Sequence, residues 1–510
     1  MKNTGYITRA TLLALIISFA TFRSVAQKKP PVKVSIRDDF HLKVRMLGGK
    51  STDTLYLALF DCVYSDYFPP EDIKMGKKDH HGDFIFQIKR CPRFFYVGLF
   101  KEHDSFNMPE YLFKVYLAGM GDDIIVDILK DSIGKNTSNG AIIPLLSFKG
   151  KGASKYNCRY ERDTLMLKKT ACLGVISKDG KLIPDSCFEK ALAINKRCLE
   201  KCKAQLTSAE YETLSVDLYS MAQLDRIGRL FEGQYYFLKD TSVASRVRKA
   251  FRTMINEKSG SFSVRGLQYS IYFPKLISES LLIDQMNSQL RVKKDNSIDR
   301  LPEQLNLDYK GHLKEKIDLF LCTRLSTMYF DQKDSFFNRS MRIVKQKETV
   351  AAIEKLFSHR TKGERAYDFV FTDRNGKKIS LSALNGKVIF IDFWYVGCVN
   401  CAGYYNDILS KVEEKFKNND KVVFISVNID KDDLKWKKSM EDDVYTSNSA
   451  INVNTEGLGI LHPMIKYYQI VSFPTLLLID KSGKMYSDKL DDLRSGVERL
   501  CQVINNVLVE

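Results

Sequence analysis

Residues 388–401 read VIFIDFWYVGCVNC, and the architecture of the C-terminal part of the chain follows from them. Residues 388–394 form an almost unbroken apolar run, which is typical of a strand buried on both faces of a sheet. Cys398 and Cys401 come after a short gap, and the apolar residues beyond them recur with a helical period as far as Phe416. The pattern therefore predicts a buried strand, a short loop and a helix that begins at a pair of cysteines.

Two cysteines separated by two residues, in the first turn of a helix, have their sulfur atoms at the same end and within disulfide reach. The unpaired backbone N–H groups and the helix dipole there favour a thiolate on the first of them, Cys398, and make it the nucleophile. We therefore predict that Cys398 attacks a partner disulfide and that Cys401 resolves the mixed disulfide. Half of a zinc site is the alternative for this spacing. No second Cys pair or His pair is placed in the sequence to complete such a site, so no metal is predicted.

The rest of residues 361–510 alternates strand and helix patterns. Asn375-Gly376 predicts a tight hairpin turn, because both positions tolerate the positive φ that such turns need. A polar, Asn-containing segment is interpreted as an insertion before a helix that ends near Tyr468. The α/β pattern comprises predicted strands at 369–371, 379–381, 388–394, 422–427, 476–479 and 484–486 and predicted helices at 399–416, 434–440 and 497–507.

In this context the residues resemble the thioredoxin-fold disulfide oxidoreductases, and specifically their exported TlpA/ResA-like branch. The resemblance covers about residues 366–510 and implies a thiol:disulfide oxidoreductase with a redox-active disulfide at its CxxC. It rests on motifs that stand in the family's order: DRNGK at 373–377, LNGK at 384–387, DFW at 392–394, the CxxC at 398–401, VNID at 427–430, and YQIVSFPT at 468–475 followed by IDKSGK at 479–484.

The resemblance also assigns substrate-binding residues. Pro474 matches the family's cis-proline, which faces the disulfide, and the backbone of Phe473 matches the one that offers strand-like hydrogen bonds to a bound substrate chain. An ordinary trans turn is the alternative for Pro474. Trp394 resembles the packing tryptophan under the active site, although a plain core aromatic is equally compatible. Both interpretations of Trp394 predict burial.

Asp392 interrupts the apolar strand, where an unpaired carboxylate is costly unless its pKa rises. In thioredoxins the matching acid relays a proton for the second cysteine, so the resemblance implies that Asp392 is the general base toward Cys401. The alternative is a structural carboxylate that points to solvent or caps a neighbouring amide.

The chain departs from the family's pattern around the cysteines. Gly397 stands where a tryptophan usually precedes the first cysteine, Val399-Asn400 lacks the usual proline, and Ser426 replaces the lysine that accompanies the buried acid. These departures favour one alternative function, a redox-inactive thioredoxin-fold protein that serves as a binding partner or scaffold. A thiol peroxidase is a second alternative, but it needs a Thr or Ser three residues before its reactive cysteine, where this chain has Tyr395.

A length of 510 residues predicts two to four domains, and a composition of 44% apolar and 28% charged residues excludes a disordered or low-complexity protein. We predict a signal peptide at 1–26, a β-rich N-terminal domain at 27–154, a helical spacer domain at 155–360 and a thioredoxin-like domain at 361–510. The leader has a basic start, a short apolar run and small residues at a cleavage site. A membrane anchor is its alternative, but the run falls short of the roughly 20 apolar residues that a bilayer needs.

The two front domains are predicted from the hydrophobic period. Short alternating runs over 31–150 predict strands, and Thr207 with Glu210 forms a capping box ahead of a helical pattern. The β domain resembles, more weakly, the domain of unknown function that precedes such thioredoxin modules in exported proteins of the Bacteroidetes type. Further helical runs lie near 243–257, 275–290, 312–328 and 347–358.

The net charge is +17, yet residues 361–510 hold 20 Lys/Arg against 21 Asp/Glu, so the basicity lies in the front part of the chain. A nucleic-acid partner is not predicted, because no nucleic-acid-binding motif accompanies the charge. The positive charge instead indicates a solvated basic face, or attraction to an acidic partner or to an anionic lipid surface. The 11 cysteines are odd in number, so at least one is free or pairs transiently. Cys198 and Cys202 are one helical turn apart and are predicted to pack in a core.

Together these features predict an exported, periplasmic thiol:disulfide oxidoreductase that reduces rather than oxidises, because the branch it resembles mostly reduces. The predicted substrates are disulfide-containing proteins, and a membrane-borne thiol donor would supply the electrons. No small-molecule cofactor is implied.

Overall fold

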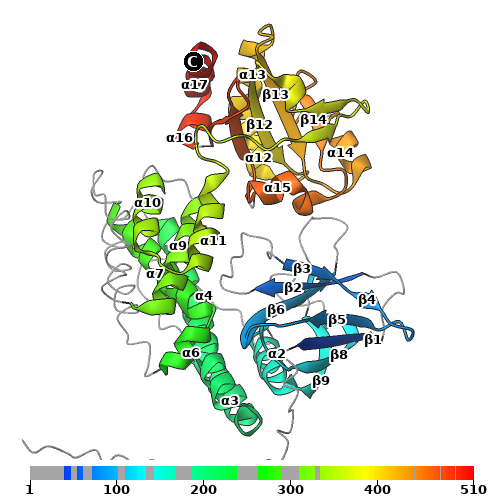
Figure 1. Cartoon of the computed structure of the whole chain (residues 1–510), viewed down its shortest axis with the longest axis vertical. Helices are drawn as coiled ribbons and strands as arrows, with labels where there is room; N and C mark the ends of the chain where they lie inside the picture. The colour runs from blue at the N-terminus through cyan, green and yellow to red at the C-terminus, as the bar shows by residue number, and fades with distance from the viewer. Residues whose placement is uncertain are drawn as a thin grey trace, which may run out of the picture. The chain divides into compact units, whose positions relative to one another are not determined.

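The structure is a computed structural model, and its described part runs from a β-rich region through a series of helices to an α/β region (Figure 1). This order agrees with the predicted change of hydrophobic period along the chain. The predicted leader, Cys62, Cys172 and the helical run near 243–257 lie outside the described residues. The described residues are 39–47, 54–60, 72–101, 110–133, 143–167, 186–237, 262–289, 309–327, 333–441, 443–470, 472–488 and 490–510.

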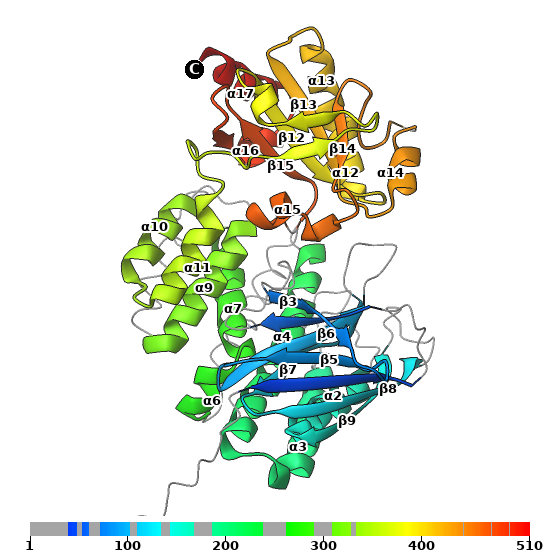
Figure 2. The same ribbon diagram turned by 45° about the vertical axis from the view of Figure 1, so that its right-hand side comes forward.

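The β-rich region contains two sheets (Figure 2). Its strands are β1 (Phe40–Met46), β2 (Leu55–Phe60), β3 (Asp72–Met75), β4 (Lys77–Lys78), β5 (Phe84–Ile88), β6 (Phe94–Lys101), β7 (Glu110–Gly119), β8 (Asp123–Ile133) and β9 (Ile143–Lys151). The strand orders are β4-β5-β1-β8-β9 and β3-β2-β6-β7. Phe40, Leu42 and Val44 of β1 are buried and alternate with half-buried residues, as expected for a strand with one face in a core. Phe40 and Leu42 of β1 share a hydrophobic cluster with Leu55 and Leu57 of β2, so the two sheets enclose a common core.

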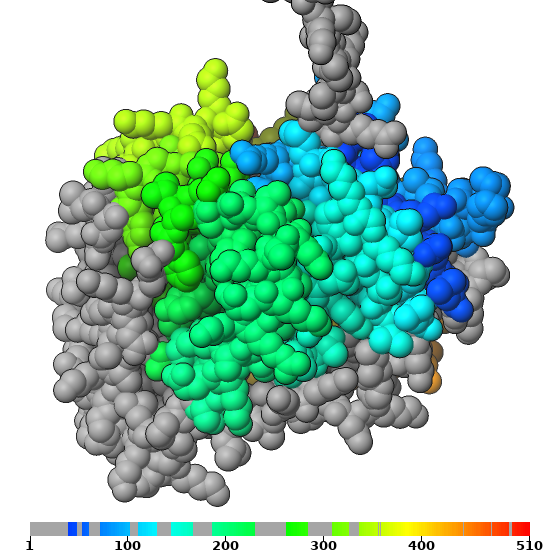
Figure 3. All heavy atoms as spheres, turned by 90° about the horizontal axis from the view of Figure 1, so that it is seen from below, coloured from blue at the N-terminus to red at the C-terminus, as the bar shows by residue number. Residues whose placement is uncertain are grey.

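Helices follow strand β9 along the chain, and Figure 3 shows outer side chains of this region in green. They are α2 (Ala153–Leu167), α3 (Ser186–Cys202), the 3-10 turn η1 (Lys203–Gln205), α4 (Ser208–Phe237), α6 (Val264–Tyr269), α7 (Tyr272–Gln289), α9 (Gly311–Thr327), α10 (Lys333–Ile343) and α11 (Lys347–Ser358). The predicted capping box is confirmed. Thr207 Oγ1 accepts a hydrogen bond from Glu210 N at 3.3 Å, and Glu210 Oε2 accepts one from Thr207 N at 2.9 Å.

The predicted packing of Cys198 and Cys202 in a core is confirmed. Both thiols, with Cys158 of α2, belong to an apolar cluster that also contains Tyr96 and Leu117 of the β-rich region. Burial raises the pKa of Cys198 to about 11, so this thiol stays protonated at neutral pH. These cysteines therefore act as small apolar side chains that join helices to a sheet.

A buried carboxyl group, Asp217 of α4, lies in the same region. Its Oδ2 accepts a hydrogen bond from the hydroxyl of Tyr96 at 2.6 Å, and its Oδ1 accepts one from the hydroxyl of Ser270 at 2.5 Å. Burial raises the pKa of Asp217 from 3.8 to about 6. Between these two pH values the folded protein holds a proton at Asp217 that the unfolded chain releases.

This difference predicts a pH effect on stability. The contribution of Asp217 is fully present below pH 3.8 and is lost as the pH rises to about 6. We expect Asp217→Asn to remove this loss. Between pH 4 and 6 the wild type should then lose roughly 2–3 kcal/mol more of its free energy of unfolding than the variant does. Denaturant titrations at several pH values measure this, with the exposed Asp123→Asn as control. Equal slopes for Asp217→Asn and wild type would contradict the assignment.

The C-terminal α/β region has the strand order β14-β13-β12-β15-β16 in its main sheet and a separate β10-β11 hairpin. The strands are β10 (Val370–Thr372), β11 (Lys378–Ser380), β12 (Val388–Trp394), β13 (Val422–Asn428), β14 (Ile451–Asn454), β15 (Thr475–Ile479) and β16 (Met485–Ser487). The helices are η3 (Ser382–Leu384), α12 (Val399–Tyr404), the π-helical turn η4 (Tyr405–Leu409), α13 (Ser410–Phe416), α14 (Asp433–Ser439), η5 (Gly459–Leu461), α15 (Pro463–Tyr467), α16 (Leu490–Leu493) and α17 (Val497–Val509).

Strand β12 lies at the centre of the main sheet, parallel to β13 and antiparallel to β15, and all of its residues are buried. Ile389, Ile391 and Phe393 pack in the cluster on one face, whereas Val388 and Phe390 pack in the cluster on the other. This confirms the prediction of a strand buried on both faces.

Two local predictions in this region had different outcomes. The hairpin at Asn375-Gly376 is confirmed, since β10 and β11 pair antiparallel and Gly376 has φ +84°. The polar segment interpreted as an insertion contains a strand, β14, which pairs with β13. The sequence INVN at 451–454 is too short and too rich in Asn for its alternation to stand out. Within the described part of the chain, no helix combines the length and apolar character needed to cross a membrane.

Candidate active site

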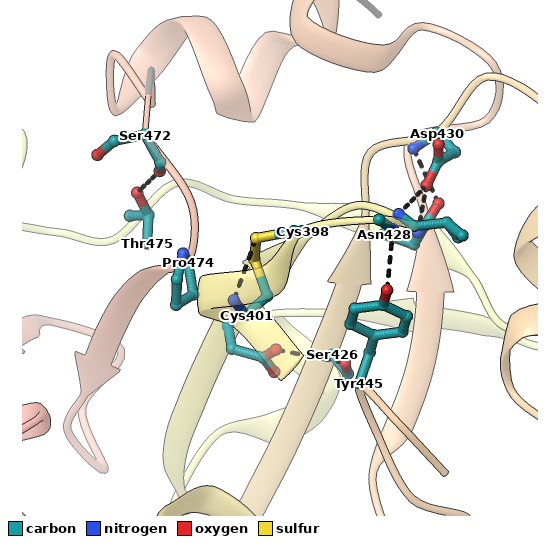
Figure 4. Close-up of a disulfide and its surroundings, with 12 residues drawn as sticks. Cys398, Cys401, Ser426, Asn428, Asp430, Tyr445, Ser472, Pro474 and Thr475 are labelled. Carbon is teal, nitrogen blue, oxygen red and sulfur yellow. Dashed lines mark hydrogen bonds between the residues drawn. A yellow bond between two sulfur atoms is a disulfide. The ribbon is translucent and has the colours of Figure 1, made fainter. Parts of the chain in front are cut away.

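The cysteine pair lies at the start of α12, directly after the loop that leaves β12 (Figure 4). Cys398 and Cys401 are joined by a disulfide, and their Cα atoms are 5.2 Å apart. Cys398 is the N-cap of the helix, and its Sγ accepts a hydrogen bond from the backbone N–H of Cys401 at 3.1 Å. The structure thus brings the two predicted residues together at a helix N-terminus, where backbone donors point at the first sulfur.

Little of the cysteine pair reaches the surface. Cys398 is 4% exposed and Cys401 is 3% exposed, and both belong to a cluster with Trp394 and Trp436. Val399, between the cysteines, is 84% exposed. The two sulfurs are therefore largely covered, whereas the side chain of Val399 between them is open to solvent.

The loop before Cys398 is held by hydrogen bonds from its backbone. The N–H of Val396 donates to Asp430 Oδ2 at 2.8 Å, and the N–H of Gly397 donates to the hydroxyl of Tyr445 at 2.9 Å (Figure 4). Asp430 is itself fixed by Asn428, whose side-chain amide donates to Asp430 Oδ2 at 2.9 Å. Gly397 has φ +97°, a conformation that side chains disfavour, so glycine suits this position.

Tyr445 is a site residue that the sequence prediction missed. Its ring stacks on Trp394, with ring centroids 4.8 Å apart and an angle of 8° between the ring planes. The indole N–H of Trp394 donates to the hydroxyl of Ser426 at 2.8 Å. Trp394 is fully buried, as both interpretations of it predicted. Tyr445 lies in the segment taken for an insertion, and nothing in its sequence neighbourhood indicates the contact with Gly397.

The contact between Tyr445 and Gly397 leads to a prediction for Tyr445→Phe. This change removes the acceptor for the Gly397 N–H but keeps the aromatic stack. We expect a loss of about 1 kcal/mol in the free energy of unfolding. The freed loop should also let iodoacetamide alkylate Cys398 several-fold faster in the reduced protein. Alkylation rates followed by mass spectrometry test this. Tyr486→Phe is the matched control, since the hydroxyl of Tyr486 bonds Glu510 near the C-terminus. Alkylation at the wild-type rate would contradict the expectation.

Asp392 is buried beneath the pair, with 5% of its surface exposed. Burial raises its pKa well above the usual range for a carboxyl group, and the nearby negative charge of Glu413 adds to the rise. The hydroxyl of Ser426 donates to Asp392 Oδ2 at 3.5 Å. The alternative in which this carboxylate points to solvent is therefore wrong, because the group lies inside the domain.

The two predicted substrate-binding residues are adjacent to the pair as well. The peptide bond between Phe473 and Pro474 is cis, so the alternative of an ordinary trans turn is wrong. Figure 4 shows Pro474 beside Cys398 and Cys401. The ring of Phe473 meets that of Tyr395 edge to face, with centroids 5.6 Å apart. The guanidinium of Arg494 donates a hydrogen bond to the carbonyl of Pro474.

Comparisons with known proteins agree with this geometry. The model of a thioredoxin-like family matches residues 385–485. The thiol-disulfide oxidoreductase ResA of Bacillus thuringiensis subsp. konkukian is 32% identical over 129 residues, which cover 25% of this chain and 68% of that protein. The protein of the same name from Bacillus subtilis is 28% identical over 125 residues, which cover 24% of this chain and 65% of that protein.

Two solved structures are also similar to part of this chain. The thioredoxin domain of a thiol-disulfide oxidoreductase from Bacteroides vulgatus is 25% identical and covers 29% of this chain and 98% of its own, with a TM-score of 0.25. A thiol:disulfide interchange protein from Bacteroides sp. is 25% identical and covers 29% of this chain and 91% of its own, also with a TM-score of 0.25. At these TM-scores the structural likeness does not bear on function.

Proposed function

This chain belongs, through its C-terminal region, to the ResA-type thiol-disulfide oxidoreductases, and from that premise we propose that its cysteine pair reduces disulfides in other proteins. The observation that carries the proposal is the disulfide between Cys398 and Cys401 at a helix N-terminus, above a buried acid. The redox-inactive scaffold is not favoured, since the relatives matched over this region are named as oxidoreductases.

We propose that the reduced protein works in two steps. The thiolate of Cys398 attacks a substrate disulfide, forms a mixed disulfide and releases the first substrate thiolate. The thiolate of Cys401 then attacks Cys398 Sγ, which restores the Cys398–Cys401 disulfide and releases the second substrate thiolate. The substrate disulfide gains two electrons and the cysteine pair loses two. The hydrogen bond from the Cys401 N–H to Cys398 Sγ would stabilise negative charge on the attacking sulfur.

Asp392 is proposed to take the proton of Cys401 before the second step. A group that accepts a proton near neutral pH needs a pKa close to the working pH, and burial raises the pKa of this carboxyl in that direction. Pro474 and the backbone of Phe473 are proposed to dock the substrate chain beside the sulfurs, with Trp394 as the packed base of the site. Their support is the placement of Pro474 next to the pair (Figure 4).

Several wider features of the proposal rest on the sequence. We propose export to the periplasm, reduction by a membrane-borne thiol donor, and a basic front part that faces an acidic partner or an anionic lipid surface. The proposed boundaries are 1–26 for the leader, 27–154 for the β-rich domain, 155–360 for the helical domain and 361–510 for the redox domain.

A redox titration of the full-length protein tests the direction of electron flow. The chain contains only two tryptophans, Trp394 and Trp436, and both pack against the cysteine pair, so their fluorescence should report its oxidation state. We expect a midpoint of about −270 mV, as for a reductant. A midpoint of about −120 mV would indicate an oxidant instead. The double variant Cys398→Ser/Cys401→Ser should show no transition.

A further inference from the structure

A second buried acid, Glu413, lies in the same layer as Asp392. On the helical segment that ends with α13, Leu409, Val412 and Phe416 form an apolar stripe that packs in one cluster with Phe390 of β12. Glu413 sits beside Val412 on the buried side of α13 and is 3% exposed. Because side chains alternate along a strand, Asp392 lies on the same face of β12 as Phe390. The two carboxyl groups therefore share the space between β12 and this helix.

Two serine hydroxyls connect Glu413, in the interior of the domain, with its surface. Its Oε2 accepts hydrogen bonds from the hydroxyls of Ser447 at 2.7 Å and Ser449 at 3.5 Å. Ser447 is half-buried and Ser449 is exposed. Glu413 Oε1 is buried and has no hydrogen-bond partner among the described residues. Oε2 of Glu413 thus contacts two hydroxyls, of which the second is exposed to water. Oε1 can accept a further hydrogen bond or a proton inside the domain.

A buried carboxyl group in this state is costly, and an apolar side chain would fill the stripe better. Burial raises the pKa of Glu413, and the Glu413 charge in turn raises that of Asp392. Among the described residues, other ionisable groups near the two acids include Tyr404, Tyr405, Asp443 and Arg494, and the guanidinium of Arg494 is 5.6 Å from the ring centre of Tyr404. Two like charges in one buried space disfavour each other, so the charge on Glu413 makes Asp392 hold its proton to higher pH.

We propose that Glu413 is the second station of a proton path that leads from Asp392 to the protein surface through Ser447 and Ser449. The proposal rests on the proposed function and deepens it. When Cys401 loses its proton to the Asp392 carboxylate, Asp392 passes a proton to the Glu413 carboxylate, and Glu413 gives it to water by way of the hydroxyls. Asp392 and Glu413 are then both carboxylates again. The Cys401 thiolate closes the disulfide with Cys398, and the departing substrate thiolate takes a proton from water.

The path is tested with the full-length protein carrying Glu413→Gln. The variant keeps the shape of the side chain but cannot hold the travelling proton. The control is Glu414→Gln, an exposed neighbour on the same helix. Each reduced protein is mixed with glutathione disulfide in a stopped-flow instrument, and tryptophan fluorescence follows closure of the Cys398–Cys401 disulfide from pH 5 to 9.

We expect Glu413→Gln to slow closure about tenfold at pH 7 in dilute buffer. Imidazole at high concentration should restore most of the rate, because it can collect the proton directly. Loss of the Glu413 charge should also move the acid limb of the pH profile to lower pH. Wild type and Glu414→Gln should show neither the slow closure nor the rescue.

The outcomes separate the two proposals. If the wild type fails to react with disulfides, the proposed function is wrong. If the wild type reacts and Glu413→Gln matches Glu414→Gln in rate, pH profile and response to imidazole, only the proton path is overturned. Should circular dichroism show that Glu413→Gln does not fold, Ser447→Ala takes its place. This change removes a hydroxyl of the path and keeps both acids, and closure at the wild-type rate in dilute buffer would then overturn the path.

Discussion

Cys398→Ser should abolish reduction of protein disulfides by the full-length protein, with turnover at least about 10³-fold below wild type. The loss is expected to be this large because a serine hydroxyl has no accessible anion at neutral pH and cannot form the mixed disulfide. Cys401→Ser should lose turnover to a comparable extent for a different reason. It retains the attacking sulfur and lacks the one that resolves, so it should accumulate a covalent complex with its substrate.

Insulin reduction with dithiothreitol as electron source measures the turnover, and non-reducing gels with mass spectrometry detect the trapped complex. Cys501→Ser is the matched control, because Cys501 is a free cysteine in the same region, on α17. It should retain wild-type turnover. Substantial turnover in Cys398→Ser would show that the reaction does not pass through this pair, and failure of Cys401→Ser to trap a substrate would assign resolution to another thiol.

The second large effect is expected for Asp392→Asn. Removal of the buried base should slow closure of the Cys398–Cys401 disulfide by about 10²-fold at pH 7. In the wild type the closure rate should rise with pH as Asp392 loses its proton at its raised pKa. In the variant this rise should disappear, which stopped-flow tryptophan fluorescence can follow. Asp407→Asn, an exposed acid on the π-helical turn η4, is the control.

Stability should change in the opposite direction from activity. A carboxyl group whose pKa is raised on folding contributes stability below its unfolded pKa, and that contribution is lost as the pH rises through the folded value. Asp392→Asn has no charge to bury, so the oxidised variant should be more stable than wild type at pH 8 to 9 and should lose less stability with rising pH. A variant that is both slow and less stable at pH 8 to 9 would indicate a structural role for Asp392 instead of a proton-transfer role.

Much of the redox domain could be predicted from local sequence patterns. The apolar run at 388–394 predicted its own strand, and Asn375-Gly376 predicted its hairpin, because a strand or a turn depends on residues close together in the chain. The spacing of Cys398 and Cys401 predicted their disulfide for the same reason, since two residues of a helical turn set the distance between the sulfurs.

Contacts between segments that are distant in the sequence could not be predicted in this way. Tyr445 reaches the N–H of Gly397 and the ring of Trp394 from a segment that looked like an insertion. Glu413 interrupts a helical stripe with a single acid, and its closeness to Asp392 follows from the way α13 lies on β12. A hydrophobic period records that a face is buried, whereas the groups that it meets depend on how separate elements pack. A few consecutive residues therefore determine the chemistry of the two sulfurs. Their access to solvent and to protons depends on side chains that tertiary packing brings from distant parts of the sequence.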